Sequence, residues 1–170
     1  MPTSDAEPVG ARRTPIARAA VRALIVSPDA EVLLLRIRSP EGVVLWIAPG
    51  GGIEAGEEIA AALRRELDEE VGLGACEIGP LVWRRCSTFD WGAWRVTQSE
   101  DYHVVHAARF EPVMRDLAEA EITEAFRWWP IEALAGTDEM VVPRTLAQIL
   151  AGYLRDGAPS APPEVEVDVD

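Results

Sequence analysis

Strand-like and helical patterns of hydrophobic residues follow one another along the first half of the chain. Residues 17–26 and 31–38 are rich in Val, Ile and Leu, and the turn-forming Ser27-Pro28-Asp29-Ala30 lies between them. This arrangement predicts a β-hairpin. A third apolar run, residues 43–48, ends at Pro49 and three glycines. From about residue 57 to residue 71 the spacing becomes helical, and Gly72 is suited to end that helix.

The second half of the chain predicts more strands and a closing helix. Strand-like runs cover residues 81–88, 94–98 and 102–110, and residues 127–129 suit one further short strand. Residues 143–154 have apolar positions at helical spacing, with Pro143 placed for the first turn. Strands around a central helix, with a second helix at the end, predict an α/β fold with a mixed β-sheet between helices.

The two ends of the chain differ from this middle part. Residues 1–15 are polar and rich in Pro and small residues, which predicts a flexible N-terminal tail before a single domain at 16–156. Residues 157–170 are Pro-rich and then acidic, with Val alternating with Glu or Asp. That alternation permits an edge strand, but the charge and the prolines favour a flexible, solvated tail.

Composition narrows the range of functions. A chain of 170 residues suits one domain, and its net charge of −13 disfavours a nucleic acid polymer as partner, because phosphate contacts need clustered Lys and Arg. No apolar run approaches the roughly 20 residues that span a bilayer. The N-terminus lacks the apolar core of a signal peptide, so we expect a cytoplasmic protein. Cys76 and Cys86 are expected to be reduced thiols.

The predicted helix carries three glutamates on one flank. With Leu67 as the origin and about 100° per residue, the core-facing stripe is Ala60, Leu63, Leu67 and Val71. Glu66, Glu69 and Glu70 lie beside this stripe, where carboxylates three and four residues apart repel one another. A solvated acidic face is one interpretation. The other is a divalent cation, since Mg²⁺ takes one or two carboxylates together with phosphate oxygens.

The residues from Gly51 to Leu73 closely resemble the signature of the Nudix hydrolase family, G-x5-E-x7-R-E-U-x-E-E-x-G-U, in which U is a bulky aliphatic residue. All nine specified positions of this Nudix box are filled, by Gly51, Glu57, Arg65, Glu66, Leu67, Glu69, Glu70, Gly72 and Leu73. The resemblance extends over about residues 16–156. It implies an α/β/α sandwich that uses Mg²⁺ or Mn²⁺ to cleave a pyrophosphate bond in a nucleoside diphosphate linked to another moiety.

The resemblance also implies roles for individual residues. Glu66 and Glu70 would bind the metal, Glu69 would bind it directly or through water, and the backbone carbonyl of Gly51 would add a ligand. Arg65 would orient these carboxylates, and its i, i+4 spacing lets it steady Glu69. In this family the general base is a box glutamate or a carboxylate on a later loop, for which the candidates are Glu121, Glu124 and Glu100.

The features that would choose the substrate lie outside the box. Arg36 and Arg38 share one face of their strand and are candidates to bind phosphates, although a solvated strand face explains them equally well. Trp46 is a candidate to stack on a nucleobase, although core packing is the favoured interpretation for any single tryptophan of this chain. The partner is expected to be a small nucleotide or another diphosphate-containing compound, with no membrane partner, and a homodimer is compatible with the sequence.

Two other functions are weighed against hydrolysis. A nucleotide-binding or regulatory module that has lost catalysis would be expected to have lost box glutamates, and none is lost. A relative similar to isopentenyl diphosphate isomerase needs a catalytic cysteine, and neither cysteine lies in a recognisable isomerase motif. The sequence patterns of several substrate subgroups are missing, so the substrate stays open.

Overall fold

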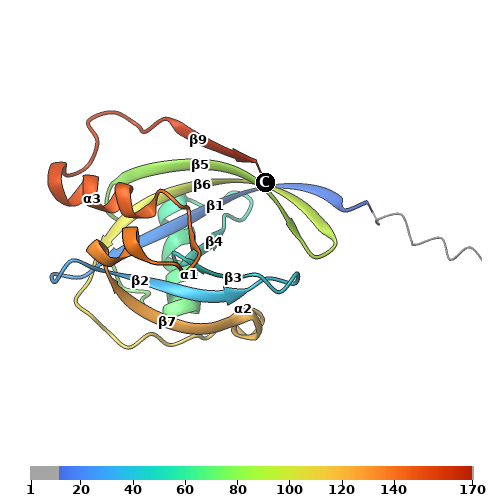
Figure 1. Ribbon diagram of the computed structural model, residues 1–170, viewed down its shortest axis with the longest axis horizontal. Helices are drawn as coiled ribbons and strands as arrows, with labels where there is room; N and C mark the ends of the chain where they lie inside the picture. Colours follow the sequence, from blue (N-terminus) through green and yellow to red (C-terminus); the bar gives the residue numbers. More distant parts are fainter. Residues whose placement is uncertain (1–11, 170) are drawn as a thin grey trace, which may run out of the picture.

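The computed structural model describes residues 12–169, and in that part the chain forms one mixed nine-stranded sheet with helices on both faces (Figure 1). Along the sheet the order is β8-β3-β2-β1-β6-β5-β9, with β4 paired to β1 and β7 paired to β2. The strands are β1 (Thr14–Val26), β2 (Glu31–Arg38), β3 (Val44–Ile47), β4 (Gly50–Gly52), β5 (Leu81–Trp91), β6 (Trp94–His106), β7 (Thr123–Pro130), β8 (Val141–Val142) and β9 (Val165–Val169). The helices are α1 (Ile59–Val71), α2 (Leu117–Ile122), α3 (Leu146–Asp156) and the 3₁₀ helix η1 (Ile131–Gly136).

The central strands are apolar on both faces because each face is covered. In β2, Leu33 and Leu35 pack with α1, whereas Val32 and Leu34 pack in the cluster that contains α3. The same alternation occurs in β1, as expected when successive side chains point to opposite faces of a sheet. Two cores therefore lie on either side of the sheet, and the predicted α/β/α sandwich with a mixed sheet is confirmed.

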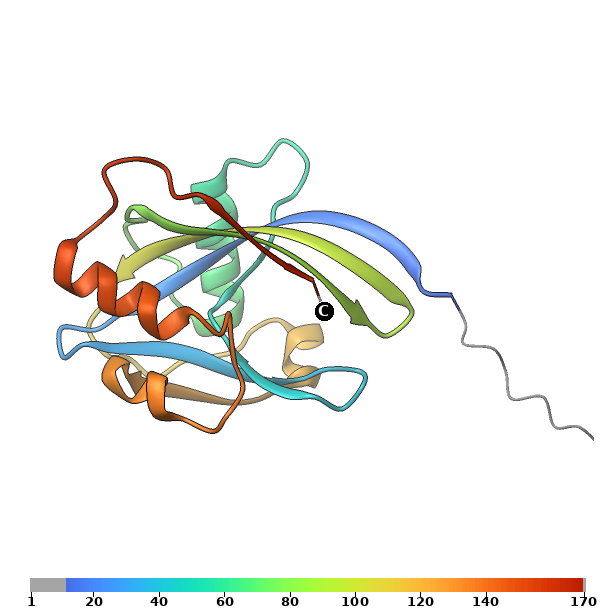
Figure 2. The same ribbon diagram turned by 45° about the horizontal axis from the view of Figure 1, so that its top comes forward.

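The sheet divides into two halves beyond the first hairpin. β1 and β2 pair at Val26 and Val32, next to the predicted turn. From there β1 runs parallel to β6, while β2 pairs with β3 and β7. Figure 2 shows β1, β5 and β6 diverging from β2, β3 and β7. The short glycine strand β4 pairs with β1, so the chain crosses from one half to the other just before α1.

Helix α1 ends as predicted, at Gly72 in the left-handed conformation, but its buried face is wider than the predicted stripe. Ala62 is fully buried with Leu63, Leu67 and Val71, whereas Ala60 is only partly buried. On the wheel Ala62 lies on the flank that carries Glu66 and Glu70. This flank is covered because α1 contacts β4 as well as β1. That flank is therefore not a solvated acidic face.

Other elements differ from the prediction mainly at their ends. Strand β6 joins the two predicted runs 94–98 and 102–110 into one strand but ends at His106, and α3 begins at Leu146 rather than Pro143. The last two residues of the predicted N-terminal tail belong to β1, which begins at Thr14, and residues 1–11 lie outside the described part.

Both cysteines are free, as expected. Among the described helices, none is long and apolar enough to cross a membrane.

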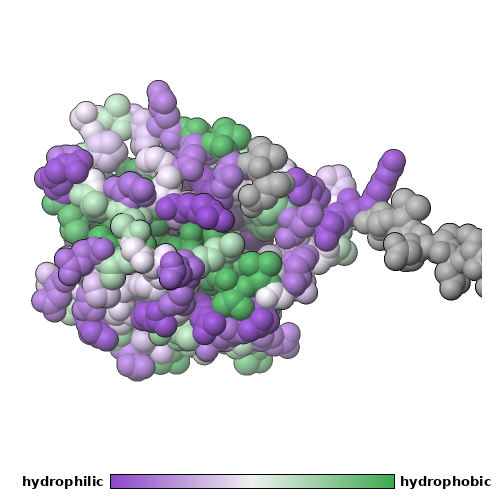
Figure 3. Space-filling view, viewed as in Figure 1, coloured by the Kyte–Doolittle hydropathy of each residue, from purple (hydrophilic) through white to green (hydrophobic). Residues whose placement is uncertain are grey.

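The C-terminal segment is a strand rather than the predicted solvated tail. Val165–Val169 pairs in parallel with β5 as an edge strand of the sheet. Glu166 and Asp168 turn inward to side chains of the fold, and Val165 and Val167 are 45% and 70% exposed, where Figure 3 shows a hydrophobic patch at the position of β9. The prediction was wrong because the acidic positions find donors on β5 that the local pattern does not reveal.

Candidate functional site

The glycine strand β4 is held so closely that its first position accepts only glycine. Gly50 has φ +136°, and a Cβ there would lie 2.1 Å from the carbonyl oxygen of Val21. This packing fixes the Gly50 N–H, which donates a 2.7 Å hydrogen bond to Oε2 of Glu70 on α1. The first residue after the crossover thus positions a box glutamate that lies 20 residues later.

Glu70 is a buried carboxylate, 4% exposed. Burial raises its pKa to about 8, while the Arg22 charge and the Gly50 N–H favour the ionised form and the Glu119 and Glu66 charges oppose it. A carboxylic acid in this environment holds its proton near neutral pH unless a positive charge approaches. The electrostatics of Glu70 therefore favour a bound cation.

Glu66 lies directly against the second glycine. A Cβ on Gly51 would lie 2.6 Å from the Glu66 carboxylate carbon. Burial also raises the pKa of Glu66, against the lowering effect of Arg65, and the Glu69 charge raises it further. Gly51 therefore leaves room for a carboxylate where any other side chain would displace it.

This contact predicts a separation of activity from stability in Gly51→Ala. The new methyl group displaces the flexible end of Glu66 rather than backbone, so we expect the thermal midpoint to change little and kcat to fall about tenfold or more. Gly52→Ala is the matched control, because a Cβ there has no neighbour within 4 Å. Equal kcat values for the two variants would contradict the proposed position of Glu66.

Arg65 connects the box to the glycine strand. Its guanidinium bonds both carboxylate oxygens of Glu57 at 3.0 and 2.9 Å, an oxygen of Glu66 at 2.7 Å and the carbonyl of Gly52 at 3.0 Å. The Arg65 hydrogen bonds lower the pKa of Glu57 to about 2. Arg65 reaches Glu69 as well, at 3.6 Å, but this contact is the longest of its ion pairs. Of the helix glutamates Glu66 and Glu69, Arg65 therefore contacts Glu66 more closely.

A fourth glutamate, Glu119 on α2, joins this group, although no pattern in the sequence indicated it. The chain before α2 is tied to the end of α1, since the N–H groups of Arg115 and Asp116 both donate to the carbonyl of Glu69. Asp116 then caps α2 and accepts from the Glu119 N–H. Burial raises the pKa of Glu119, Arg22 lowers it, and the Asp116 and Glu66 charges raise it. Glu119 thus lies within the electrostatic reach of Glu66 and Glu70.

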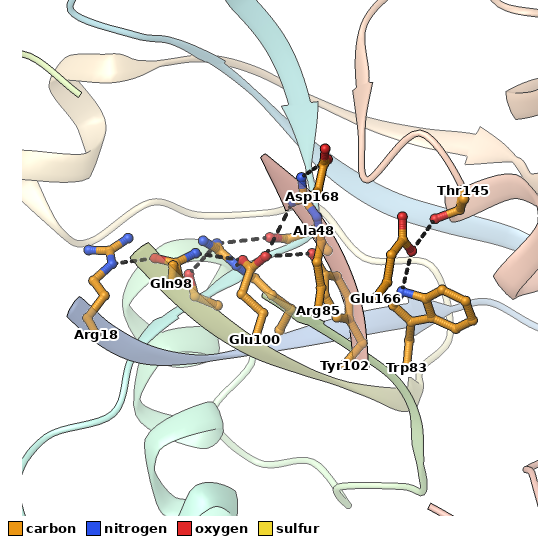
Figure 4. A network of polar contacts seen from close by, with 12 residues as sticks. Arg18, Ala48, Trp83, Arg85, Gln98, Glu100, Tyr102, Thr145, Glu166 and Asp168 are labelled. Atoms are coloured by element: carbon orange, nitrogen blue, oxygen red, sulfur yellow. Dashed lines mark hydrogen bonds and ion pairs between the residues drawn. The ribbon is translucent and has the colours of Figure 1, made fainter. Parts of the chain in front are cut away.

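The three predicted general-base candidates lie in other environments. Glu121 is exposed. Glu124 forms ion pairs with Arg38 at 2.6 Å and Arg36 at 3.5 Å. Glu100 is 4% exposed and accepts hydrogen bonds from Arg22, Gln98 and Tyr102, with Arg85 at 3.5 Å (Figure 4). The pKa of Glu100 is lowered, because these partners outweigh its burial.

The candidate substrate residues lie on neighbouring strands, Arg36 and Arg38 on β2 and Trp46 on β3, and Trp46 packs in the core. Arg36 and Arg38 share one face of β2 and both reach Glu124, which makes them a paired cationic surface. Trp46 is 1% exposed and lies edge-on to Trp129, and its Nε1 donates to Glu139. A ring that is covered in this way packs in the core and offers no face to a nucleobase.

The donor set fits a hard divalent cation. Carboxylate oxygens are what Mg²⁺ and Mn²⁺ prefer. Glu66 and Glu70 lie against the glycine strand, and Gly51 provides a cradle that a Cβ would fill. After burial, the Glu69 charge raises the pKa of Glu66, and the Glu119 and Glu66 charges raise that of Glu70. Within residues 12–169, no three acidic, Cys or His side chains are already grouped around one point. Instead Arg65 and the Gly50 N–H hold the two carboxylates.

Comparison with known proteins gives consistent matches over this region. The chain matches the NUDIX domain at residues 17–151. It is 33% identical over 131 residues to the nucleoside triphosphatase NudI of Salmonella agona (strain SL483), covering 72% of this chain and 90% of that protein. The MutT protein from Methanosarcina mazei Go1 has a TM-score of 0.60 at 19% identity, covering 84% of this chain and 96% of that one. The MutT NUDIX hydrolase from Burkholderia pseudomallei has a TM-score of 0.56 at 25% identity, covering 78% and 95%.

Proposed function

Because this chain belongs to the Nudix family and is a pyrophosphohydrolase, we propose that it uses Mg²⁺ or Mn²⁺ to hydrolyse a small nucleotide, with nucleoside triphosphates as the first candidates. The relative NudI is named a nucleoside triphosphatase, which supports that choice of substrate. The net charge of −13 supports a small substrate rather than a nucleic acid polymer, because a polymer needs an extended basic surface.

One observation carries this proposal: buried Glu70 lies under the Gly50 N–H while Glu66 and Glu119 act on it electrostatically. A buried carboxylate is unfavourable without positive charge. The Arg22 charge offsets only part of the cost at Glu70, whose pKa stays raised, so the site favours a further cation. In the proposed reaction a divalent cation provides this positive charge and the substrate provides a pyrophosphate group. A bound divalent cation supplies charge for the phosphoryl oxygens and a water of lowered pKa.

The residues of the chain take distinct roles in this proposal. Glu66 and Glu70 hold the cation, with Glu69 and the Gly51 carbonyl as further ligands. Arg65 keeps Glu66 directed toward the glycine strand through its 2.7 Å bond. Glu119 accepts the proton of the attacking water, since a raised pKa brings a carboxylate closer to the pH at which it must take up and release protons. Arg36 and Arg38 bind phosphate oxygens of the substrate.

The direct test is a panel of nucleoside triphosphates, nucleotide sugars, ADP-ribose, dinucleotides and coenzyme A, each with Mg²⁺, with Mn²⁺ and with EDTA. We expect hydrolysis of at least one nucleoside triphosphate that stops in EDTA. Hydrolysis that persists in EDTA would overturn metal dependence. Binding of nucleotides without turnover of any compound would instead favour the catalytically inactive module.

The position of Glu119 predicts that Glu119→Gln lowers kcat about a hundredfold, within the range expected for loss of a general base, while KM changes little. Glu111→Gln is the control, because Glu111 is exposed and its substitution changes the net charge as much as Glu119→Gln does. Glu121→Gln tests the nearest alternative. If Glu121→Gln lost activity and Glu119→Gln kept it, the base would be Glu121 and the assignment to Glu119 would be wrong.

A further inference from the structure

Arg85 on β5 is a buried arginine with an incomplete set of partners. Its side chain is 8% exposed, its Nη2 donates a 2.8 Å hydrogen bond to Asp168 on β9, and its Nη1 lies 3.5 Å from Glu100. Its Nε is buried and has no hydrogen-bond partner among the described residues. A guanidinium can bind an oxyanion through two parallel N–H groups, and here one of them is unused.

Ser87 adds a second unused group beside it. Ser87 lies two residues after Arg85, on the same face of β5, is 4% exposed, and its Oγ also lacks a partner within residues 12–169. Its position in the ladder is opposite Asp168. Buried polar groups are nearly always hydrogen-bonded, so two adjacent exceptions beside one displaceable carboxylate indicate a site for a larger anion.

The Asp168 side chain is held loosely enough for another anion to displace it from Arg85. Its side chain is 43% exposed, so water screens its pairing with Arg85. Strand β9 pairs with β5 at the edge of the sheet, and its residues Val165 and Val167 bury little surface. Its other inward side chain, Glu166, accepts from Trp83 and Thr145 (Figure 4). Strand β9 is thus attached by its backbone pairing with β5 and by the hydrogen bonds of two carboxylates, Glu166 and Asp168.

The same network connects Arg85 to the candidate active site. Glu100 lies next to Arg85 (Figure 4) and also accepts a hydrogen bond from Arg22. Arg22 in turn donates to the carbonyls of Ala48 and Gly50, on the crossover that precedes α1. The Gly50 N–H in turn holds Glu70. Arg85 is therefore linked to a box glutamate through a chain of polar contacts that runs by Glu100, Arg22 and Gly50.

We propose that Arg85 and Ser87 form a subsite for a phosphoryl group of the nucleotide substrate, which Asp168 occupies until the substrate displaces it. A phosphoryl group brings three oxygens, enough to pair with Nε and Nη2 of Arg85 and with the Ser87 hydroxyl, whereas Asp168 satisfies one of these donors. Strand β9 is then an internal competitor. This inference rests on the proposed function for the identity of the anion.

The kinetic test compares wild type with Asp168→Asn, using the nucleoside triphosphate that the panel identifies. Removing the competing charge is expected to lower KM about threefold to tenfold with kcat unchanged. Glu164→Gln is the matched control, because Glu164 is exposed in the segment before β9 and the change in net charge is the same. In an Arg85→Lys background, which keeps the charge and loses the fork, the effect of Asp168→Asn should largely disappear.

A second measurement does not depend on turnover. Hydrogen–deuterium exchange of residues 158–169 is followed in the full-length chain, in EDTA, with and without millimolar inorganic pyrophosphate. We expect pyrophosphate to accelerate exchange of the β9 amides in wild type and to have no such effect in Arg85→Lys. Slower exchange would mean that the strand forms a wall of the site rather than a competitor, and would overturn the proposal.

The two readouts separate the subsite from the proposed function. If no nucleotide is hydrolysed, the proposed function fails, and the exchange measurement alone decides whether Arg85 takes a phosphoryl group. If nucleotides are hydrolysed but Asp168→Asn has an unchanged or higher KM, the subsite is rejected and the proposed function stands.

Discussion

Glu70→Gln is expected to lower kcat by at least about a hundredfold while making the metal-free protein more stable at about pH 8. The loss of activity follows from removing a charge that holds the proposed cation. The gain in stability follows from burial, because Gln has a similar size, can still accept from the Gly50 N–H through its amide oxygen, and never carries a buried negative charge.

The pH dependence gives this prediction its sign. The pKa of Glu70 is raised from an ordinary value of 4.5 to about 8. Between these values the folded protein holds a proton that the unfolded chain has released, so the free energy of unfolding falls as pH rises through this window. The advantage of Glu70→Gln is therefore small near pH 5 and grows to a few kcal/mol at about pH 8. The pKa values of Glu66 and Glu119 are also raised, so the free energy of unfolding of the variant still falls with rising pH, but less steeply than that of wild type.

Urea denaturation at several pH values, in EDTA and in MgCl₂, measures this effect. Mg²⁺ should stabilise wild type more than the variant, since a cation that binds the ionised carboxylate favours the folded state. Glu58→Gln at the start of the same helix is the control, because Glu58 is exposed. An unchanged kcat of Glu70→Gln would contradict the assignment of Glu70 to the metal site. Equal stability of wild type and Glu70→Gln at every pH would contradict the raised pKa of Glu70.

The box residues show which parts of such a site the sequence can predict. Glu66 and Glu70 lie one helical turn apart on one element, so a helical wheel places them together without further information. Glu119 follows Glu70 by 49 residues and lies on a short helix that has no periodic pattern, and hydrogen bonds from Arg115 and Asp116 to α1 bring it close. Contacts of this kind depend on how the chain returns to the sheet, which local spacing does not encode.

The fold shows the same division between local and distant information. Apolar runs predicted most strands and the helix, because both faces of the central sheet are buried and the runs are nearly continuous. The C-terminal alternation of Val with acidic residues was recognised, but its charge favoured a tail, and only donors on β5 make it a strand. Trp46 was a candidate to stack on a base, with core packing the favoured interpretation, and the structure buries it against Trp129, a partner 83 positions away.

Glu100→Ala is expected to destabilise the protein by about 3–5 kcal/mol, the largest stability loss predicted for a single substitution here. Glu100 is the shared acceptor for Arg22, Arg85, Gln98 and Tyr102, and its loss leaves Arg22, whose side chain is 11% exposed, without its carboxylate partner. Glu124→Ala is the matched control. It also removes a carboxylate that pairs with two arginines, but these lie at the surface, so a loss below about 1 kcal/mol is expected.

The pH dependence of Glu100 runs opposite to that of Glu70. Its pKa is lowered because its partners outweigh its burial, so its contribution is fully present above the ordinary carboxyl pKa and is lost as pH falls through the lowered value. Urea denaturation of wild type and Glu100→Gln at acidic and neutral pH checks this sign. Glu100→Gln also separates structure from catalysis, since Gln keeps the shape and an acceptor for Arg22. A folded Glu100→Gln that lost kcat a hundredfold at unchanged KM would make Glu100 the general base, and would contradict its role as the anchor of this network.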